Sequence, residues 1–127
     1  DSDVLIWLLR GNAHAAAVVG ALDRWAISAV TYMELAQGCR NKIELKALQK
    51  VFRSTDAEVL PISAKISELA CTLVEKYALS HSVYLADALI AATAIEHAMP
   101  LLTGNAKHFK VIERLEVKTY KPQTTTA

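Results

Sequence analysis

Hydrophobic positions change their spacing repeatedly along the chain, which predicts helices alternating with short strands. In the segment 43–53, Leu45 and Leu48 fall on one side of a helix, and Lys46 and Lys50 largely on the other. Short apolar runs such as 25–30 instead predict buried strands. Alternation of this kind favours an α/β fold with a central, mainly parallel sheet of four to five strands.

The predicted elements cover most of the chain. Helices are predicted at 4–9, 14–24, 31–38, 43–53, 64–77, 83–97 and 105–112, and strands at 25–30, 57–62, 100–103 and 115–119. Ser63 is a candidate N-cap for the helix that follows it. Because a sheet of this type begins with a strand, we expect a first strand, truncated or absent here, before Asp1. Residues 122–127 are predicted to be a flexible tail.

Length and composition indicate one globular domain spanning residues 1–127. The chain has 53% hydrophobic and 21% charged residues, and its formal net charge of +1 does not indicate a strongly basic nucleic-acid binder. No apolar stretch is long enough to span a bilayer, so we expect an intracellular, cytoplasmic protein. Cys39 and Cys71 stand singly, which indicates neither a zinc site nor a disulfide framework.

Three carboxylates far apart in the sequence are candidate site residues. Asp1, like its neighbour Asp3, precedes a predicted helix, where an acid also serves as a cap. Glu34 has a rival role, because Thr31 and Glu34 match the spacing of a capping box.

The third acid, Asp87, lies in an apolar helical segment without a basic neighbour at helical spacing, so it must find a cation, a metal or hydrogen-bond donors elsewhere. If the three acids converge, they form an oxygen-rich site for Mg²⁺ or Mn²⁺.

Four sequence blocks, in order and at characteristic separations, resemble PIN-domain ribonucleases of the VapC toxin type. They are DSDVLI (1–6), ISAVT (27–31) with Glu34 and Leu35, ADALIAATA (86–94), and PLLTGN (100–105) with His108 and Phe109. The resemblance runs from residue 1 to about residue 117. It implies a three-layer α/β/α domain with an acidic, Mg²⁺- or Mn²⁺-binding pocket at the strand ends.

Carried over by position, the resemblance assigns Asp1, Glu34 and Asp87 as catalytic, metal-binding residues. Asn105, Thr103 and Asp3 are supporting residues. Many relatives have a fourth acid after the fourth strand, but the segment 103–108 contains none. The resemblance further implies hydrolysis of RNA, often tRNA, by a metal-activated water. The implied partners are the RNA substrate, a cognate antitoxin and a second copy of the chain in a homodimer.

Other functions stay open at the level of sequence. A PIN-like module without catalysis, which binds RNA or protein, is one alternative, because the fourth acid is absent. A nucleotide-binding Rossmann-like domain is a poorer one, because the four glycines form no phosphate-binding loop. Arg10, Lys107 and Lys110 flank the predicted pocket and are candidate contacts for RNA phosphates. The helices at 43–53 and 64–77 are predicted to form a protruding pair whose groove receives the antitoxin.

Overall fold

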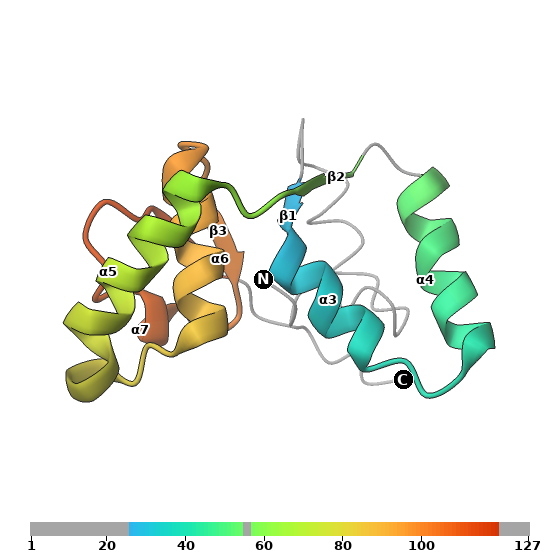
Figure 1. The fold of residues 1–127 in the computed structure, drawn as a ribbon, viewed down its shortest axis with the longest axis horizontal. Coiled ribbons are helices and arrows are strands. Elements are labelled where there is room, and N and C mark those ends of the chain that lie inside the picture. The colour runs from blue at the N-terminus through green and yellow to red at the C-terminus, as the bar shows by residue number, and fades with distance from the viewer. Residues whose placement is uncertain (1–25, 55–56, 120–127) are drawn as a thin grey trace, which may run out of the picture.

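The computed structural model describes residues 26–54 and 57–119. The predicted helices at 4–9 and 14–24 and the tail at 122–127 lie outside these residues. The described elements, in chain order, are β1 (Ala26–Ser28), α3 (Ala29–Gln37), α4 (Lys42–Ser54), β2 (Glu58–Leu60), α5 (Ala64–His81), α6 (Leu85–Glu96), β3 (Leu101–Thr103), α7 (Ala106–Phe109) and β4 (Val117–Thr119) (Figure 1). The predicted mixture of helices and short strands is therefore confirmed.

The described strands form two parallel pairs. Strand β1 pairs with β2, with Ile27 opposite Val59, and β3 pairs with β4, with Leu102 opposite Lys118. Parallel neighbours need a crossover connection, which α3 and α4 supply for the first pair and α7 for the second. The prediction of parallel pairing is confirmed.

Helix α3 begins earlier than the sequence pattern predicts. Ser28, the last residue of β1, has extended backbone angles and is the N-cap, and its Oγ accepts a hydrogen bond from the Thr31 N–H at 3.0 Å. The Ser28 hydroxyl also donates to Thr31 Oγ1 at 3.1 Å, and both side chains are buried. Glu34 therefore lies in the middle of the helix instead of at its third position. The capping-box role for Thr31 and Glu34 is wrong, and the Glu34 carboxylate is not used as a cap.

Ser28→Ala is expected to lower the free energy of unfolding by about 1–2 kcal/mol, because it removes the N-cap and the buried partner of Thr31. Urea denaturation followed by circular dichroism measures this change. The matched control is Ser67→Ala on an exposed position of α5, which should change stability by at most about 0.5 kcal/mol. Equal stability of the two variants would contradict the capping role of Ser28.

Helices α5 and α6 pack side by side and form the main core. The Ser63 N-cap is confirmed, since its Oγ accepts from the Ile66 N–H at 3.2 Å. Helix α5 continues past the predicted end to His81 and stops at Ser82, whose φ of 55° is left-handed. Helix α6 buries Ala88, Ala91 and Ala92 completely, and these small side chains allow close approach of the neighbouring elements.

A second, smaller core lies between α3 and α4. Leu48 of α4 is buried against Ile27 of β1 and Leu35 of α3. Figure 1 shows α4 and α5 at opposite ends of the molecule, with β1 and α3 between them. The prediction that they form one protruding pair is therefore wrong, because each helix uses its apolar face against a different neighbour. Within the described segments, no helix combines the length and apolarity needed to cross a membrane.

Candidate active site

Asp87 is held in the first turn of α6. The rest of this helix is anchored by buried residues on several sides, including Ala88, Ile90 and Ala91. The Asp87 side chain remains 32% exposed. A carboxylate in the first turn is favoured by the positive end of the helix dipole. The residue is thus placed at the edge of the core, where a polar ligand can reach it.

His108 supplies the partner that the sequence around Asp87 lacks. Its Nε2 lies 2.8 Å from Asp87 Oδ2, although the two residues are 21 positions apart. An ionised carboxylate only accepts hydrogen bonds, so Nε2 carries the hydrogen and donates it. His108 was not predicted as a site residue, because the four histidines form no metal-binding spacing. Its place directly after the fourth sequence block, PLLTGN (100–105), was the signal that indicated a position near the pocket.

Helix α7 brings His108 to Asp87. Ala106 and Phe109 are buried, and Phe109 is only 1% exposed. The His108 and Phe109 rings meet edge to face, with centroids 5.4 Å apart. Because α7 is a single turn, its position depends on this buried anchor more than on helix propensity.

Two of the predicted supporting residues build the turn that leads into α7. Thr103 is fully buried, and its Oγ1 accepts a hydrogen bond from the Asn105 N–H at 3.0 Å. The Asn105 carbonyl accepts from the His108 N–H at 3.1 Å. The side chain of Asn105 is exposed and makes no capping hydrogen bond. Thr103 and Asn105 therefore help to fix the backbone conformation just before His108.

Glu34 is electrostatically coupled to Asp87. Partial burial raises the pKa of Glu34 above its ordinary value, and the negative charge of Asp87 raises it further. Helix α3, which carries Glu34, contacts α6, which carries Asp87. The fold thus places two acids that are remote in the sequence within range of each other's charge. Two carboxylates in this arrangement repel each other, and a bound cation would remove that repulsion.

The other predicted acids, Asp1 and Asp3, lie outside the described residues. Among residues 26–54 and 57–119, no group of three or more His, Cys, Asp and Glu side chains is arranged to hold a metal ion. Glu34 and Asp87 offer the hard oxygen ligands that Mg²⁺ and Mn²⁺ prefer, but the two alone are an incomplete site. The donor chemistry fits such an ion, with Asp1 as the predicted third ligand.

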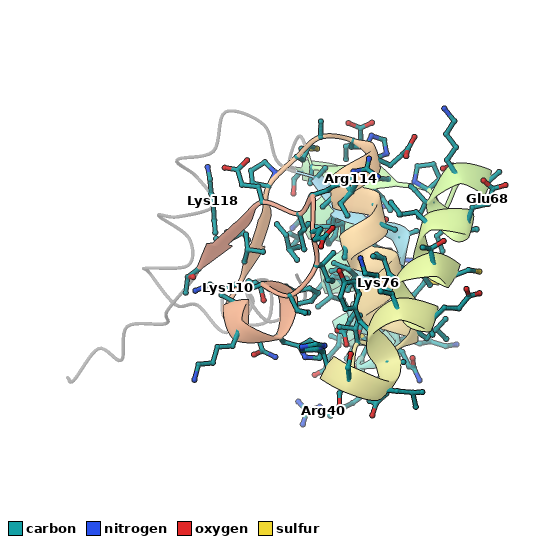
Figure 2. The ribbon with its side chains drawn as sticks, turned by 90° about the vertical axis from the view of Figure 1, so that its left-hand side faces the viewer. Arg40, Glu68, Lys76, Lys110, Arg114 and Lys118 are labelled. Atoms are coloured by element: carbon teal, nitrogen blue, oxygen red, sulfur yellow. The ribbon has the colours of Figure 1, made fainter. Side chains whose placement is uncertain are left out.

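Exposed basic side chains lie on and beside α7, the helix that carries His108. Lys107, within α7, and Lys110, directly after it, are both exposed. Figure 2 shows Lys110 and Lys118 on the side of the molecule away from Glu68 and α5. Lys76, in contrast, lies on α5 and is 3.8 Å from Glu113 in an exposed ion pair. The exposed lysines Lys107 and Lys110 thus lie within and directly after the helix that carries His108, the partner of Asp87.

Comparison with protein families finds one model that matches most of the chain. The PIN domain model covers residues 1–115. Among individual proteins, the chain is 37% identical to Ribonuclease VapC10 of Mycobacterium tuberculosis, over 91% of this chain and 88% of the relative. It is 31% identical to Ribonuclease VapC19 of the same species, over 91% of this chain and 94% of the relative.

Solved structures with the same fold come from toxin–antitoxin systems. A toxin–antitoxin complex from Klebsiella pneumoniae contains a chain of TM-score 0.78 and 29% identity, with 94% of this chain and 93% of that chain covered. VapBC2 from Rickettsia felis, solved with a DNA fragment from its promoter, gives a TM-score of 0.81 at 22% identity, with 94% and 96% covered. The PIN domain match and these structural neighbours confirm the three-layer α/β/α fold that the sequence blocks imply.

Proposed function

This chain belongs to the PIN-domain family, and from that membership we propose that it is a VapC-type endoribonuclease, the toxin of a toxin–antitoxin pair. The Mycobacterium tuberculosis relatives are ribonucleases, and they align with nearly the whole chain. The observation that carries the proposal is that Glu34 and Asp87, two acids remote in the sequence, come within range of each other's charge, and paired carboxylates favour a divalent cation. We place the activity in the cytoplasm, where RNA is the substrate.

Mg²⁺ or Mn²⁺ is proposed as the cofactor, held by Asp87, Glu34 and Asp1. When bound, such an ion lowers the pKa of a water molecule and stabilises negative charge on phosphate oxygens. Asp87 and Asp1 would hold the ion through their carboxylate oxygens, and Glu34 would orient the water or support the metal. Lys107 and Lys110 contact RNA phosphates and align the backbone beside Asp87.

RNA cleavage is expected to need a divalent ion. Small structured RNAs incubated with the protein and Mg²⁺ or Mn²⁺ should be cut, EDTA should abolish the cutting, and excess metal should restore it. The products should carry 5′-phosphate and 3′-hydroxyl ends, because water and not the ribose 2′-hydroxyl is the nucleophile. Mapping of the ends by sequencing measures this. Cutting that survives both EDTA and Asp87→Asn would exclude metal catalysis.

A binding module without catalysis is the second candidate function. It is favoured by the absence of any acid in the segment 103–108, where Asn105 brings no charge. Calorimetric titration with Mn²⁺ separates the two functions. A catalyst should bind Mn²⁺ in a way that depends on Asp87, whereas a PIN-like RNA- or protein-binding module should not.

A cognate antitoxin and a second copy of the chain are the proposed protein partners. The Klebsiella pneumoniae structure, at 29% identity, is a toxin–antitoxin complex. Several large apolar side chains are exposed on this chain, among them Met33 at 57%, Leu85 at 72% and Ile43 at 80%. Met33, Leu85 and Ile43 lie on three different helices, α3, α6 and α4. Such side chains are available to more than one partner.

A further inference from the structure

We propose that His108 is a positioning residue that holds the Asp87 carboxylate in the orientation required for the metal. The assignment rests on the proposed function and deepens it. It starts from the 2.8 Å hydrogen bond between His108 Nε2 and Asp87 Oδ2. Asp87 makes no other side-chain hydrogen bond to the residues that the structure describes. His108 is therefore the described group that limits rotation of this carboxylate.

The direction of the hydrogen bond decides what His108 can do. Nε2 donates to Oδ2, so its lone pair is not available and Nε2 is not a metal ligand in this arrangement. Oδ2 accepts the hydrogen bond from the imidazole, and Oδ1, which accepts none from the described residues, would be the oxygen more open to a cation. A carboxylate held in this way loses less rotational freedom when a metal binds. Hydrogen-bond partners of ligating groups typically contribute 10–100-fold to metal affinity.

The surroundings of His108 make it a firm support. Its side chain is only 22% exposed, and its ring packs edge to face on Phe109. Phe109 is fixed in the main core, and the His108 N–H donates to the Asn105 carbonyl. The imidazole is thus held from its own backbone and from the core at once. A long, flexible donor such as lysine would lack this restriction.

The rival explanation is that the hydrogen bond only ties α7 to α6 and adds stability. In that case, loss of the imidazole would lower the melting temperature of the metal-free protein and leave the metal affinity of the folded protein unchanged. A second rival is that His108 turns and binds the metal itself. These three roles predict different behaviour for two amide substitutions of different length.

His108→Gln and His108→Asn form the matched pair. The Gln amide nitrogen falls near the place of Nε2 and can donate to Asp87 Oδ2, whereas the shorter Asn amide falls near Nδ1 and cannot reach. Isothermal titration with Mn²⁺ is expected to show affinity weakened on the order of 10–100-fold in His108→Asn. In His108→Gln, most of the affinity should be retained. His97→Asn, at the exposed end of α6, is the control for loss of a histidine and should bind like the wild type.

Thermal melting of each metal-free variant accompanies the titration. The positioning role is overturned if folded His108→Asn binds Mn²⁺ as tightly as the wild type, whatever its melting temperature. It is also overturned if His108→Gln loses as much affinity as His108→Asn, because an amide donor would then not replace the imidazole. A wild-type protein that binds no Mn²⁺ defeats the proposed metal-dependent function itself, and so the two failures are distinguishable.

Discussion

Asp87→Asn is expected to lower kcat/KM for RNA cleavage on the order of 10²–10³-fold while the protein stays folded. A bound metal supplies several kcal/mol of charge stabilisation, and each 1.36 kcal/mol corresponds to a factor of ten in rate. The substitution removes the carboxylate charge that is proposed to attract the ion. The fold should survive, because the Asn carbonyl oxygen can still accept from His108 Nε2 and the side chain is partly exposed.

The matched control for Asp87→Asn is Glu96→Gln, which removes one negative charge from the same helix at an exposed position in its last turn. Steady-state cleavage of one labelled RNA, measured for both variants and the wild type, compares the two sites directly. Equal rates for Asp87→Asn and Glu96→Gln would remove Asp87 from the catalytic site. A large loss in both would indicate a general electrostatic effect and not a specific ligand.

Glu34→Gln is expected to have the second-largest effect, a loss of cleavage on the order of 10²-fold, because it removes a charge that is proposed to support the metal. Burial and the charge of Asp87 raise the pKa of Glu34 above its ordinary value. This raised pKa belongs to the metal-free protein, because a bound cation would lower it again. In the wild type, the affinity for Mn²⁺ should therefore fall off at a higher pH than for an unperturbed glutamate, and Mn²⁺ titrations at a series of pH values measure this.

The raised pKa of Glu34 also predicts how the stability of the metal-free protein depends on pH. A carboxyl whose pKa is higher in the folded than in the unfolded state favours folding most below the ordinary value of 4.5, and this contribution is lost as pH rises through the folded pKa. Without metal at pH 7, the neutral Glu34→Gln protein should therefore melt higher than the wild type. The difference in melting temperature should vanish when the pH falls below the pKa of this carboxyl in the unfolded state.

Glu44→Gln is the control with the reverse sign. Hydrogen bonds from Arg40 lower the pKa of Glu44, so its ionised form favours the folded state at neutral pH. That contribution is lost as pH falls through the lowered pKa. Glu44→Gln should thus melt lower than the wild type at pH 7, in contrast to Glu34→Gln. Melting curves from pH 3 to 8 test both, and a Glu34→Gln protein that melts lower at pH 7 would contradict the raised pKa.

The position of most described elements could be predicted from local sequence alone. Helical spacing around Leu48 located α4, and Ser63 marked the start of α5, because periodicity and capping depend on neighbours within a few residues. Boundaries were less well predicted where a tertiary contact competes with a local signal. Thr31 and Glu34 matched one capping pattern, but Ser28 caps α3 from the buried end of β1.

The sequence by itself determined the types and order of the helices and strands, their apolar faces, and the presence of acidic residues at positions 34 and 87. It also carried the family resemblance through its four blocks. Only the tertiary structure decided which remote groups meet, because packing and not periodicity sets distances between elements. In the folded chain, His108 forms a hydrogen bond with Asp87, and the charge of Asp87 raises the pKa of Glu34. Helices α4 and α5 lie apart because their apolar faces are buried against different neighbours.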